Sequence, residues 1–231
     1  ENNLEKWQKF YSKALKINPN SSRAYHGLGV IEEILRKNYD KALKYLEKAY
    51  ELDPFDTNSL IDIGFVYTKQ GNFKKAEYYF SKAIEVNPNR AISHFNLGSL
   101  YGMLGEYKKA SECFKRAVKL QPTNCGALYF LAKAYFDIGD YEKSKEFLRK
   151  VIMLNDSDFS IRAHYTLGLS YMKLGQYEKA IKVFKTIDSG KDIANVYFSL
   201  ALCYSHLNRF DEAMKFYRKA QNKGFKPLYK I

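Results

Sequence analysis

Residues 97–110 read LGSLYGMLGEYKKA, and residues 167–180 read LGLSYMKLGQYEKA, so eight of the fourteen letters agree. Less similar copies of the same motif begin at Leu28, Ile63, Leu131 and Leu200. The six copies start 35, 34, 34, 36 and 33 residues apart. A fixed period of this size is typical of stacked supersecondary units. The sequence therefore predicts a repeat array rather than an ordinary globular domain.

The repeat that begins at Ala91 shows what one unit contains. Apolar or small residues recur at steps of three and four, at His94, Leu97, Gly98 and Tyr101 and again at Tyr107, Ala110, Phe114 and Ala117. This spacing places each set on one face of a helix. Gly105 lies between the two sets, where a turn needs freedom of φ, and Pro122 follows the second, where it ends a helix. We expect Gly98 and Ala110 to be small because two helix backbones approach closely there.

The repeated pattern resembles the tetratricopeptide repeat, a family whose consensus sequence is W-x2-L-G-x2-Y, then A-x3-F, then A and P. The resemblance covers essentially the whole chain. It implies an all-α fold, a right-handed superhelical α-solenoid of stacked antiparallel helix pairs. Two positions depart from the family pattern. Position 4 has no tryptophan in any repeat; its residues are Tyr25, Leu60, His94, Leu128, His164 and Tyr197. Position 32 is proline in three repeats but Asp156 and Asp192 in two others.

The repeat boundaries predict a single array over residues 1–231. It consists of a half repeat (1–21, second helix only), repeats 22–56, 57–90, 91–124, 125–160, 161–193 and 194–227, and a tail, 228–231. The missing first helix and the absence of an initiating Met suggest a piece of a longer chain. Repeat arrays usually need polar caps, so the uncapped ends leave self-association open.

The three cysteines, Cys113, Cys125 and Cys203, are an odd number without CxxC spacing. This pattern favours packing roles in a reducing compartment such as the cytoplasm, over disulfides or metal binding. The localisation itself stays undecided, because a signal or anchor could lie outside this segment. No apolar run of the length needed to span a bilayer occurs in the sequence.

The net charge is +13, and the sequence places basic residues in two columns on the second helices. Position 19 is Lys6, Lys41, Lys75, Lys109, Lys143 and Lys179, and position 26 is Lys13, Lys48, Lys82, Arg116, Lys150 and Lys219. One interpretation is a solvated outer face. The other is a docking surface for an acidic protein, a membrane or a nucleic acid.

The sequence indicates no catalysis, cofactor or metal. It contains no P-loop, no GxGxxG after a strand and no GxSxG. His94 and His164 share a packing position, and His26 is isolated from carboxylates at ligand spacing. Asp156 and Asp158 lie before a predicted helix, where Asp is typical of an N-cap rather than a metal ligand. We therefore expect that this segment is not an enzyme.

The resemblance implies a concave groove formed by the first helices, with positions 2, 5, 9 and 12 facing it. The candidate partner-groove residues are Ile61, Phe65, Phe95, Tyr129, Lys133, Arg162, Tyr165, Leu169, Phe198 and Leu202. Lys133 and Arg162 would orient an acidic side chain beside apolar anchors. One sub-class of the family clamps C-terminal carboxylates, but only Asn96 matches its basic and amide set, which argues against such a clamp.

The favoured function is a protein–protein interaction scaffold that binds a protein or peptide segment in this groove through aromatic and aliphatic anchors. One alternative is a basic outer surface that binds nucleic acid or another polyanion. The consensus pattern of the repeats disfavours this alternative, because RNA-binding helical repeats of similar length lack it. Another is the recruiting arm of an enzyme whose catalytic domain lies outside this segment.

Overall fold

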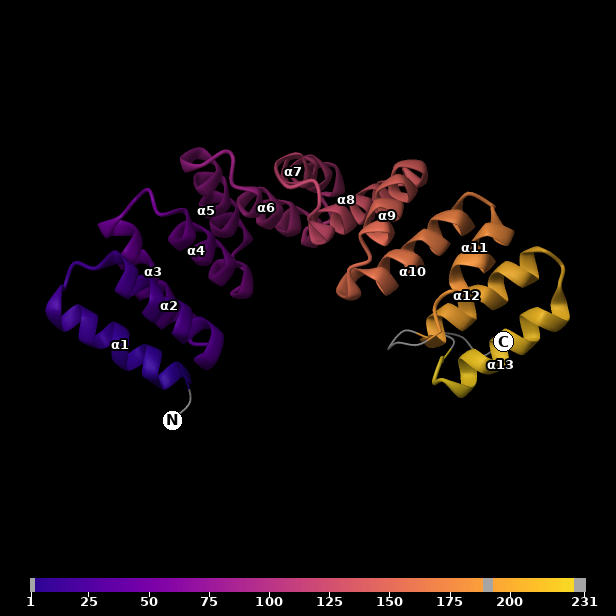
Figure 1. The fold of residues 1–231 in the computed structure, drawn as a ribbon, viewed down its shortest axis with the longest axis horizontal. Helices are drawn as coiled ribbons and strands as arrows, with labels where there is room; N and C mark the ends of the chain where they lie inside the picture. Colours follow the sequence, from indigo (N-terminus) through magenta and orange to yellow (C-terminus); the bar gives the residue numbers. More distant parts are fainter. Residues whose placement is uncertain (1–2, 189–192, 227–231) are drawn as a thin grey trace. The chain divides into compact units, whose positions relative to one another are not determined.

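The computed structural model describes residues 3–188 and 193–226, and all regular structure in these residues is α-helical (Figure 1). The first seven helices are α1 (Asn3–Ile17), α2 (Ser22–Arg36), α3 (Tyr39–Leu52), α4 (Thr57–Lys69), α5 (Phe73–Val86), α6 (Ala91–Met103) and α7 (Tyr107–Leu120). The remaining helices are α8 (Cys125–Ile138), α9 (Tyr141–Leu154), α10 (Ser157–Lys173), α11 (Tyr177–Phe184), α12 (Ile193–His206) and α13 (Phe210–Asn222). The predicted all-α class is confirmed.

The chain divides into two compact units, residues 1–120 and residues 121–231. In unit 1, α2 packs on α3, α4 on α5 and α6 on α7, and the second helix of each pair contacts the first helix of the next. In unit 2, α8–α9, α10–α11 and α12–α13 form pairs that are joined in the same way. Each unit therefore stacks helix pairs, as a helical solenoid does.

Local sequence signals set the ends of the helices. Side chains that accept hydrogen bonds from first-turn amides precede seven helices: Ser21, Asn38, Asp56, Asn72, Asn124, Asp140 and Asp156. Gly105 follows α6 with φ +76°, which glycine adopts without steric cost. The equivalent turns at the first and last pairs contain Lys37 and Asn208, which are also left-handed. These caps and turns restrict each helix to its own part of the repeat.

Gly98 is small for a reason that differs from the prediction. A Cβ atom added at Gly98 would lie 2.9 Å from the ring of Phe114, and one at Gly168 would lie 2.4 Å from the ring of Phe184. The close neighbour is thus an aromatic side chain of the second helix rather than its backbone. The ring is buried against the glycine, which leaves no room for a methyl group.

The segment after α9 departs from the regular repeat. Asp156 accepts hydrogen bonds from the amides of Asp158 (2.9 Å) and Phe159 (3.3 Å), as the N-cap interpretation predicts. Helix α10 therefore begins before Ile161, where the sequence places the repeat start, and it spans 17 residues. The predicted departure at Asp192 lies outside the described residues.

Candidate functional site

The first helices of unit 1 line an open cavity of about 440 Å³, which we call the unit 1 groove. Its lining comes from α2, α4 and α6, with one residue from α3. The residues are Val30, Glu33, Ile34, Leu46, Ile61, Asp62, Phe65, Val66, Ile92 and Asn96. Both α2 and α6 contact α4, so side chains from three successive repeats meet there.

Large apolar side chains of the unit 1 groove are open to solvent. The exposed fractions are 39% for Phe65, 61% for Ile34 and 44% for Ile92. The Lys69 ammonium lies 4.9 Å from the centre of the Phe65 ring, one helical turn further along α4. Ile61, by contrast, is buried and forms the floor. The groove thus combines a packed floor with an exposed apolar rim, a surface type that marks binding sites.

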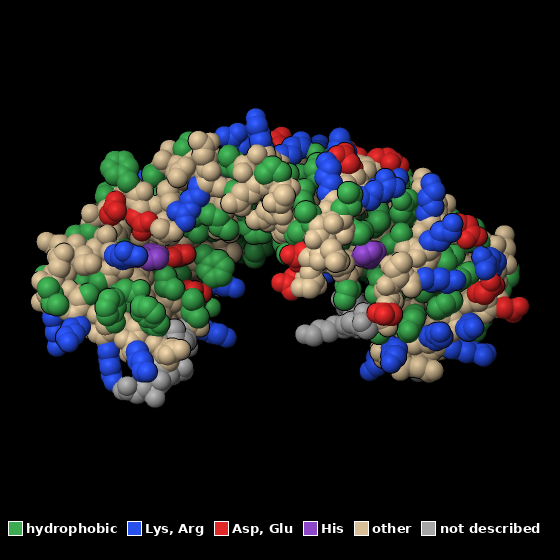
Figure 2. All heavy atoms as spheres, in the orientation of Figure 1, with side chains coloured by type: hydrophobic (Ala, Val, Ile, Leu, Met, Phe, Trp, Pro, Cys, Tyr) green, Lys and Arg blue, Asp and Glu red, His purple; other side chains and the backbone are tan. Residues whose placement is uncertain are grey.

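Two carboxylates add negative charge to this groove. Burial raises the pKa of the Glu33 carboxyl, the Asp62 carboxylate raises it further, and Lys69 opposes both. Asp62 Oδ2 on α4 lies 2.7 Å from His26 Nε2 on α2. Figure 2 shows acidic and basic side chains interspersed with hydrophobic ones on one face of the molecule. Burial lowers the pKa of the His26 imidazole, but the hydrogen bond and the charge of Asp62 outweigh burial and raise it overall. His26 therefore contacts a carboxylate that lies 36 residues away in the sequence, a pairing that spacing along the chain did not reveal.

Unit 2 contains a second cavity of about 380 Å³, the unit 2 groove. It is lined by Tyr129, Phe130, Lys133, Ile161, Arg162, Tyr165, Ile187, Ile193 and Val196. Lys133 Nζ lies 2.8 Å from Oδ2 of Asp137 on the next turn of α8. Arg162 is exposed and forms no ion pair within the part of the chain that the structure describes. The unit 2 groove thus offers aromatic walls and an available guanidinium.

The structure gathers some candidate residues and leaves others apart. Ile61 and Phe65 line the unit 1 groove, and Tyr129, Lys133, Arg162 and Tyr165 line the unit 2 groove.

The other four candidates line neither groove. Phe95 lies 5.6 Å from Phe114 between ring centres, which places it against the second helix of its own pair. Phe198 stacks on Phe225 at 4.1 Å. Leu169 is half-buried, and Leu202 is exposed on α12.

The candidate set missed several lining residues. Glu33 occupies position 12 of its repeat, a position that the resemblance assigns to the groove, so the same rule would have found it. Asp62 and Asn96 occupy position 6, and Ile34 occupies position 13; these positions enter the lining through packing of successive first helices. Nothing in the sequence alone identifies Ile187 or Val196 as groove residues, because Ile187 follows α11 and Val196 lies on α12.

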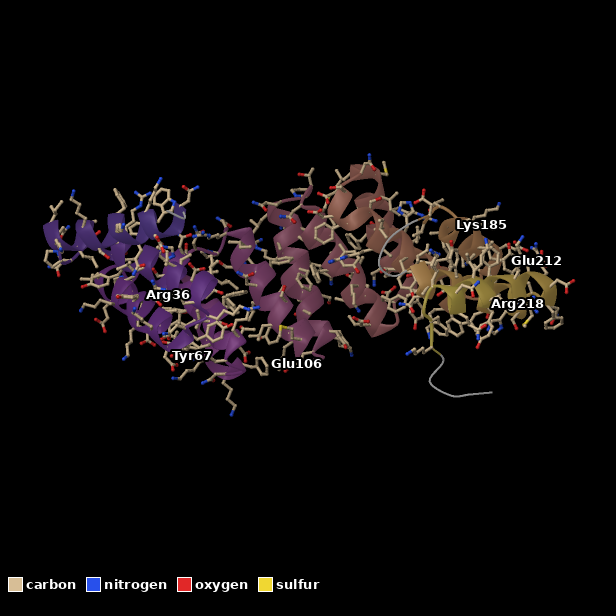
Figure 3. The ribbon with its side chains drawn as sticks, turned by 90° about the horizontal axis from the view of Figure 1, so that it is seen from below. Arg36, Tyr67, Glu106, Lys185, Glu212 and Arg218 are labelled. Carbon is tan, nitrogen blue, oxygen red and sulfur yellow. The ribbon has the colours of Figure 1, made fainter. Side chains whose placement is uncertain are left out.

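The lysine columns have structural contacts. Lys75, Lys109 and Lys143 lie over tyrosine rings at 4.9, 5.0 and 5.4 Å. Lys41 Nζ lies 2.8 Å from buried Glu32, which also pairs with Arg36 at 2.6 Å (Arg36 is labelled in Figure 3).

The same tyrosines connect successive helix pairs. Tyr67, also labelled in Figure 3, donates to Glu47 at 3.0 Å, and burial and this carboxylate raise its pKa to about 12. Tyr101 donates to Glu77 at 2.6 Å. These lysines and tyrosines therefore brace the stack by cation–π contacts and hydrogen bonds.

The remaining titratable groups suggest packing rather than chemistry. His94 Nε2 lies 2.8 Å from the Pro88 carbonyl, and His164 Nδ1 lies 2.8 Å from the Ser160 carbonyl. Burial raises the pKa of Cys203 to about 12. Among the described residues, no three His, Cys, Asp or Glu side chains are grouped so as to hold a metal ion. None of the described helices has the length and apolarity that crossing a membrane requires.

Comparison with protein families gives four matching models. Models described as tetratricopeptide repeat match residues 1–21 and 22–56, residues 55–123 and residues 165–227. A model described as anaphase-promoting complex, cyclosome, subunit 3 matches residues 103–187. No curated protein sequence matches the chain.

Solved structures share the fold at low sequence identity. YrrB is 18% identical, with a TM-score of 0.68 over 78% of this chain and 92% of its own. PilF of Pseudomonas aeruginosa is 18% identical, with a TM-score of 0.69 over 87% and 91%. A chain of the APC/C hetero-tetramer Cut9–Hcn1 is 18% identical, with a TM-score of 0.70, and matches 97% of this chain but 44% of that one.

Proposed function

The chain belongs to the tetratricopeptide repeat family, and on that premise we propose that it is a non-catalytic scaffold that binds partner segments in its two grooves. The observation that carries the proposal is the exposed apolar rim of the unit 1 groove. Ile34, Phe65 and Ile92 come from three successive repeats and surround one cavity of about 440 Å³. Leaving such side chains in water is unfavourable, so their burial by a partner would stabilise a complex.

The occupant that fits the unit 1 groove is a short segment with large apolar anchors. A helical segment would present anchors at i, i+3 or i+4, and i+7, and an extended one would present alternate residues. YrrB, one of the structural neighbours, is described as having an unusual peptide-binding site. At 18% identity that likeness concerns the fold, so the proposal rests on the groove of this chain.

The unit 2 groove complements this surface with aromatic walls and positive charge. Tyr129 lies 5.4 Å from Phe130 and 5.5 Å from Phe159 between ring centres, which makes a rigid aromatic wall. Arg162 provides planar donors that suit a carboxylate. We propose that this groove takes apolar anchors next to an acidic side chain.

The proposal is tested by selecting ligands from a peptide library displayed on phage against the full chain. Selected peptides are then measured by fluorescence anisotropy against wild type and against Phe65→Ala/Ile92→Ala. We expect enrichment of large apolar residues and at least a tenfold loss of affinity in the variant, since two exposed anchors would each lose roughly 1 kcal/mol or more of burial.

The matched control is Phe55→Ala, which removes an equally large side chain that is exposed and lies outside both grooves. It should bind the selected peptides as wild type does. Equal binding by Phe65→Ala/Ile92→Ala and wild type, with unchanged helical circular dichroism, would place the ligand away from the unit 1 groove and contradict the proposal there.

A further inference from the structure

The unit 1 groove is acidic, although the chain as a whole carries +13. Glu33 on α2 and Asp62 on α4 line the same cavity, and none of the residues that line it is a lysine or arginine. The Glu33 side chain is half-buried. A carboxylate that is partly removed from water next to a second carboxylate is in an unfavourable environment. A partner's cation would relieve it.

The charges around these carboxylates leave room for an added cation. Asp62 has a partner within the chain, since its Oδ2 lies 2.7 Å from His26 Nε2 on α2. For Glu33, no ion pair is observed within the described residues. Lys69 lies over the Phe65 ring at 4.9 Å and lowers the pKa of Glu33 against the effects of burial and Asp62. The chain's own lysine thus places an ammonium over the ring of Phe65, in a groove that Glu33 also lines.

We propose that the unit 1 groove selects a partner segment that carries a lysine or arginine beside a large apolar residue. The cation would interact with Glu33 and Asp62, and its aliphatic stem would cover Phe65 and Ile34. This inference rests on the proposed function and adds the charge class of the partner to it.

Charge and shape both favour this occupant over an acidic or purely apolar one. A lysine or arginine side chain buries its methylene stem on apolar surface and keeps its charge at a polar rim. The exposed Phe65 face adds a cation–π contribution. An acidic residue would bring a third negative charge to Glu33 and Asp62, at low effective dielectric. Such a residue suits the unit 2 groove, with its unpaired Arg162, instead.

The probes are three terminally capped synthetic peptides with the same leucine-rich sequence and a different central residue: lysine, norleucine or glutamate. Their binding to the full chain is measured by isothermal titration calorimetry at neutral pH. We expect the lysine peptide to bind at least about tenfold more tightly than the glutamate peptide, with the norleucine peptide between them. This factor corresponds to one hydrogen bond between charged groups at a partly exposed site.

Two variants test which residues recognise the cation. Glu33→Gln should reduce the preference for lysine over norleucine, and it is not expected to disturb the fold because no hydrogen bond to the Glu33 side chain is observed within the described residues. Lys69→Met should strengthen binding of the lysine peptide, because it removes the cation that competes for the Phe65 ring. Lys74→Met, an exposed lysine of α5 outside the groove, is the matched control and should change nothing.

The outcomes separate this inference from the proposed function. Suppose that the norleucine peptide binds wild type but not Phe65→Ala, and that the lysine peptide binds wild type no more tightly than the norleucine peptide does. The charge inference is then overturned, while groove binding stands. A lysine preference that survives unchanged in Glu33→Gln would also overturn the inference, since the cation must then lie elsewhere. If Phe65→Ala binds all three peptides as wild type does, the groove itself is not the site.

Discussion

Glycine at position 8 of the repeat illustrates how single residues control the packing of a helix pair. At Gly168 the nearest ring atom of Phe184 would lie 2.4 Å from an added Cβ, and Phe184 is completely buried. The ring cannot move without opening the contact between α10 and α11. Phe80 and Phe114 lie over Gly64 and Gly98 in the same way. At these three positions the glycine makes room for a ring, whereas at Gly29 the close neighbour is the Leu46 side chain.

Gly168→Ala should destabilise the protein by about 1–3 kcal/mol, because overpacking a closed core forces shifts in side chains and backbone. The measurement is urea unfolding followed by circular dichroism. Gly102→Ala is the matched control, because Gly102 lies in α6 with nothing near its added Cβ. That change should be neutral or stabilising by up to about 1 kcal/mol through helix propensity. Equal stability losses in the two variants would contradict the ring-on-glycine explanation.

At the scale of the element, helix α4 depends on its cap. The Asp56 carboxylate accepts hydrogen bonds from the amides of Asn58 (3.0 Å) and Ser59 (3.2 Å) and from the Ser59 hydroxyl (2.7 Å). Burial raises the pKa of Asp56, but these hydrogen bonds outweigh it, so the net pKa is lowered. Because α4 carries Ile61, Asp62 and Phe65, its start determines where the middle of the unit 1 groove lies.

Asp56→Ala should cost about 1 kcal/mol of stability at neutral pH, in the usual range for a lost N-cap. Because the folded-state pKa is lowered, the charged cap contributes its stability above the unfolded pKa of about 3.9, and that contribution is lost as pH falls through the folded value. Asp56→Asn retains a capping oxygen but cannot titrate. Urea unfolding between about pH 7 and pH 3 should show this acid loss in wild type but less of it in Asp56→Asn; parallel curves would contradict the assignment.

At the scale of the whole molecule, the positive charge and the grooves predict different responses to salt. Many lysines of the two columns already contact tyrosine rings or carboxylates, for example Lys75 on Tyr67 and Lys150 with Glu146 at 2.6 Å. These contacts explain the columns through the stability of the stack. Binding in the grooves depends mainly on apolar area, which salt does not screen.

Selected peptides should therefore bind with a weak dependence on salt between about 50 and 200 mM. A protein that neutralises six phosphates would show a log–log slope near about −5 and lose roughly a thousandfold in affinity over that range. Fluorescence anisotropy with a labelled DNA duplex and with a selected peptide compares the two cases directly. Tight DNA binding with the steep slope, together with weak peptide binding, would move the function to the basic surface.

The sequence by itself determined the all-α class, the helix pairs and most turn positions, because these follow from local spacing, caps and glycines that recur in most repeats. A helix cap between Asp156 and Asp158 could be found in the same way, whereas Phe65 and Arg162 were candidates because of the family resemblance. The start of α10 at Ser157 could not be fixed, because both Asp156 and Asp158 are suitable caps and only the structure shows that Asp156 is the one used.

Only the tertiary structure decided which side chains of successive repeats contact one another. It placed Asp62 against His26, brought Glu33 into the same groove, and set Phe65 between Ile34 and Ile92. Residues about thirty positions apart come together because successive first helices stack. The sequence pattern predicts this stacking, but it does not predict which side chains meet. The repeated residues therefore specify the fold, and the varied ones acquire their chemistry only when the stack brings them together.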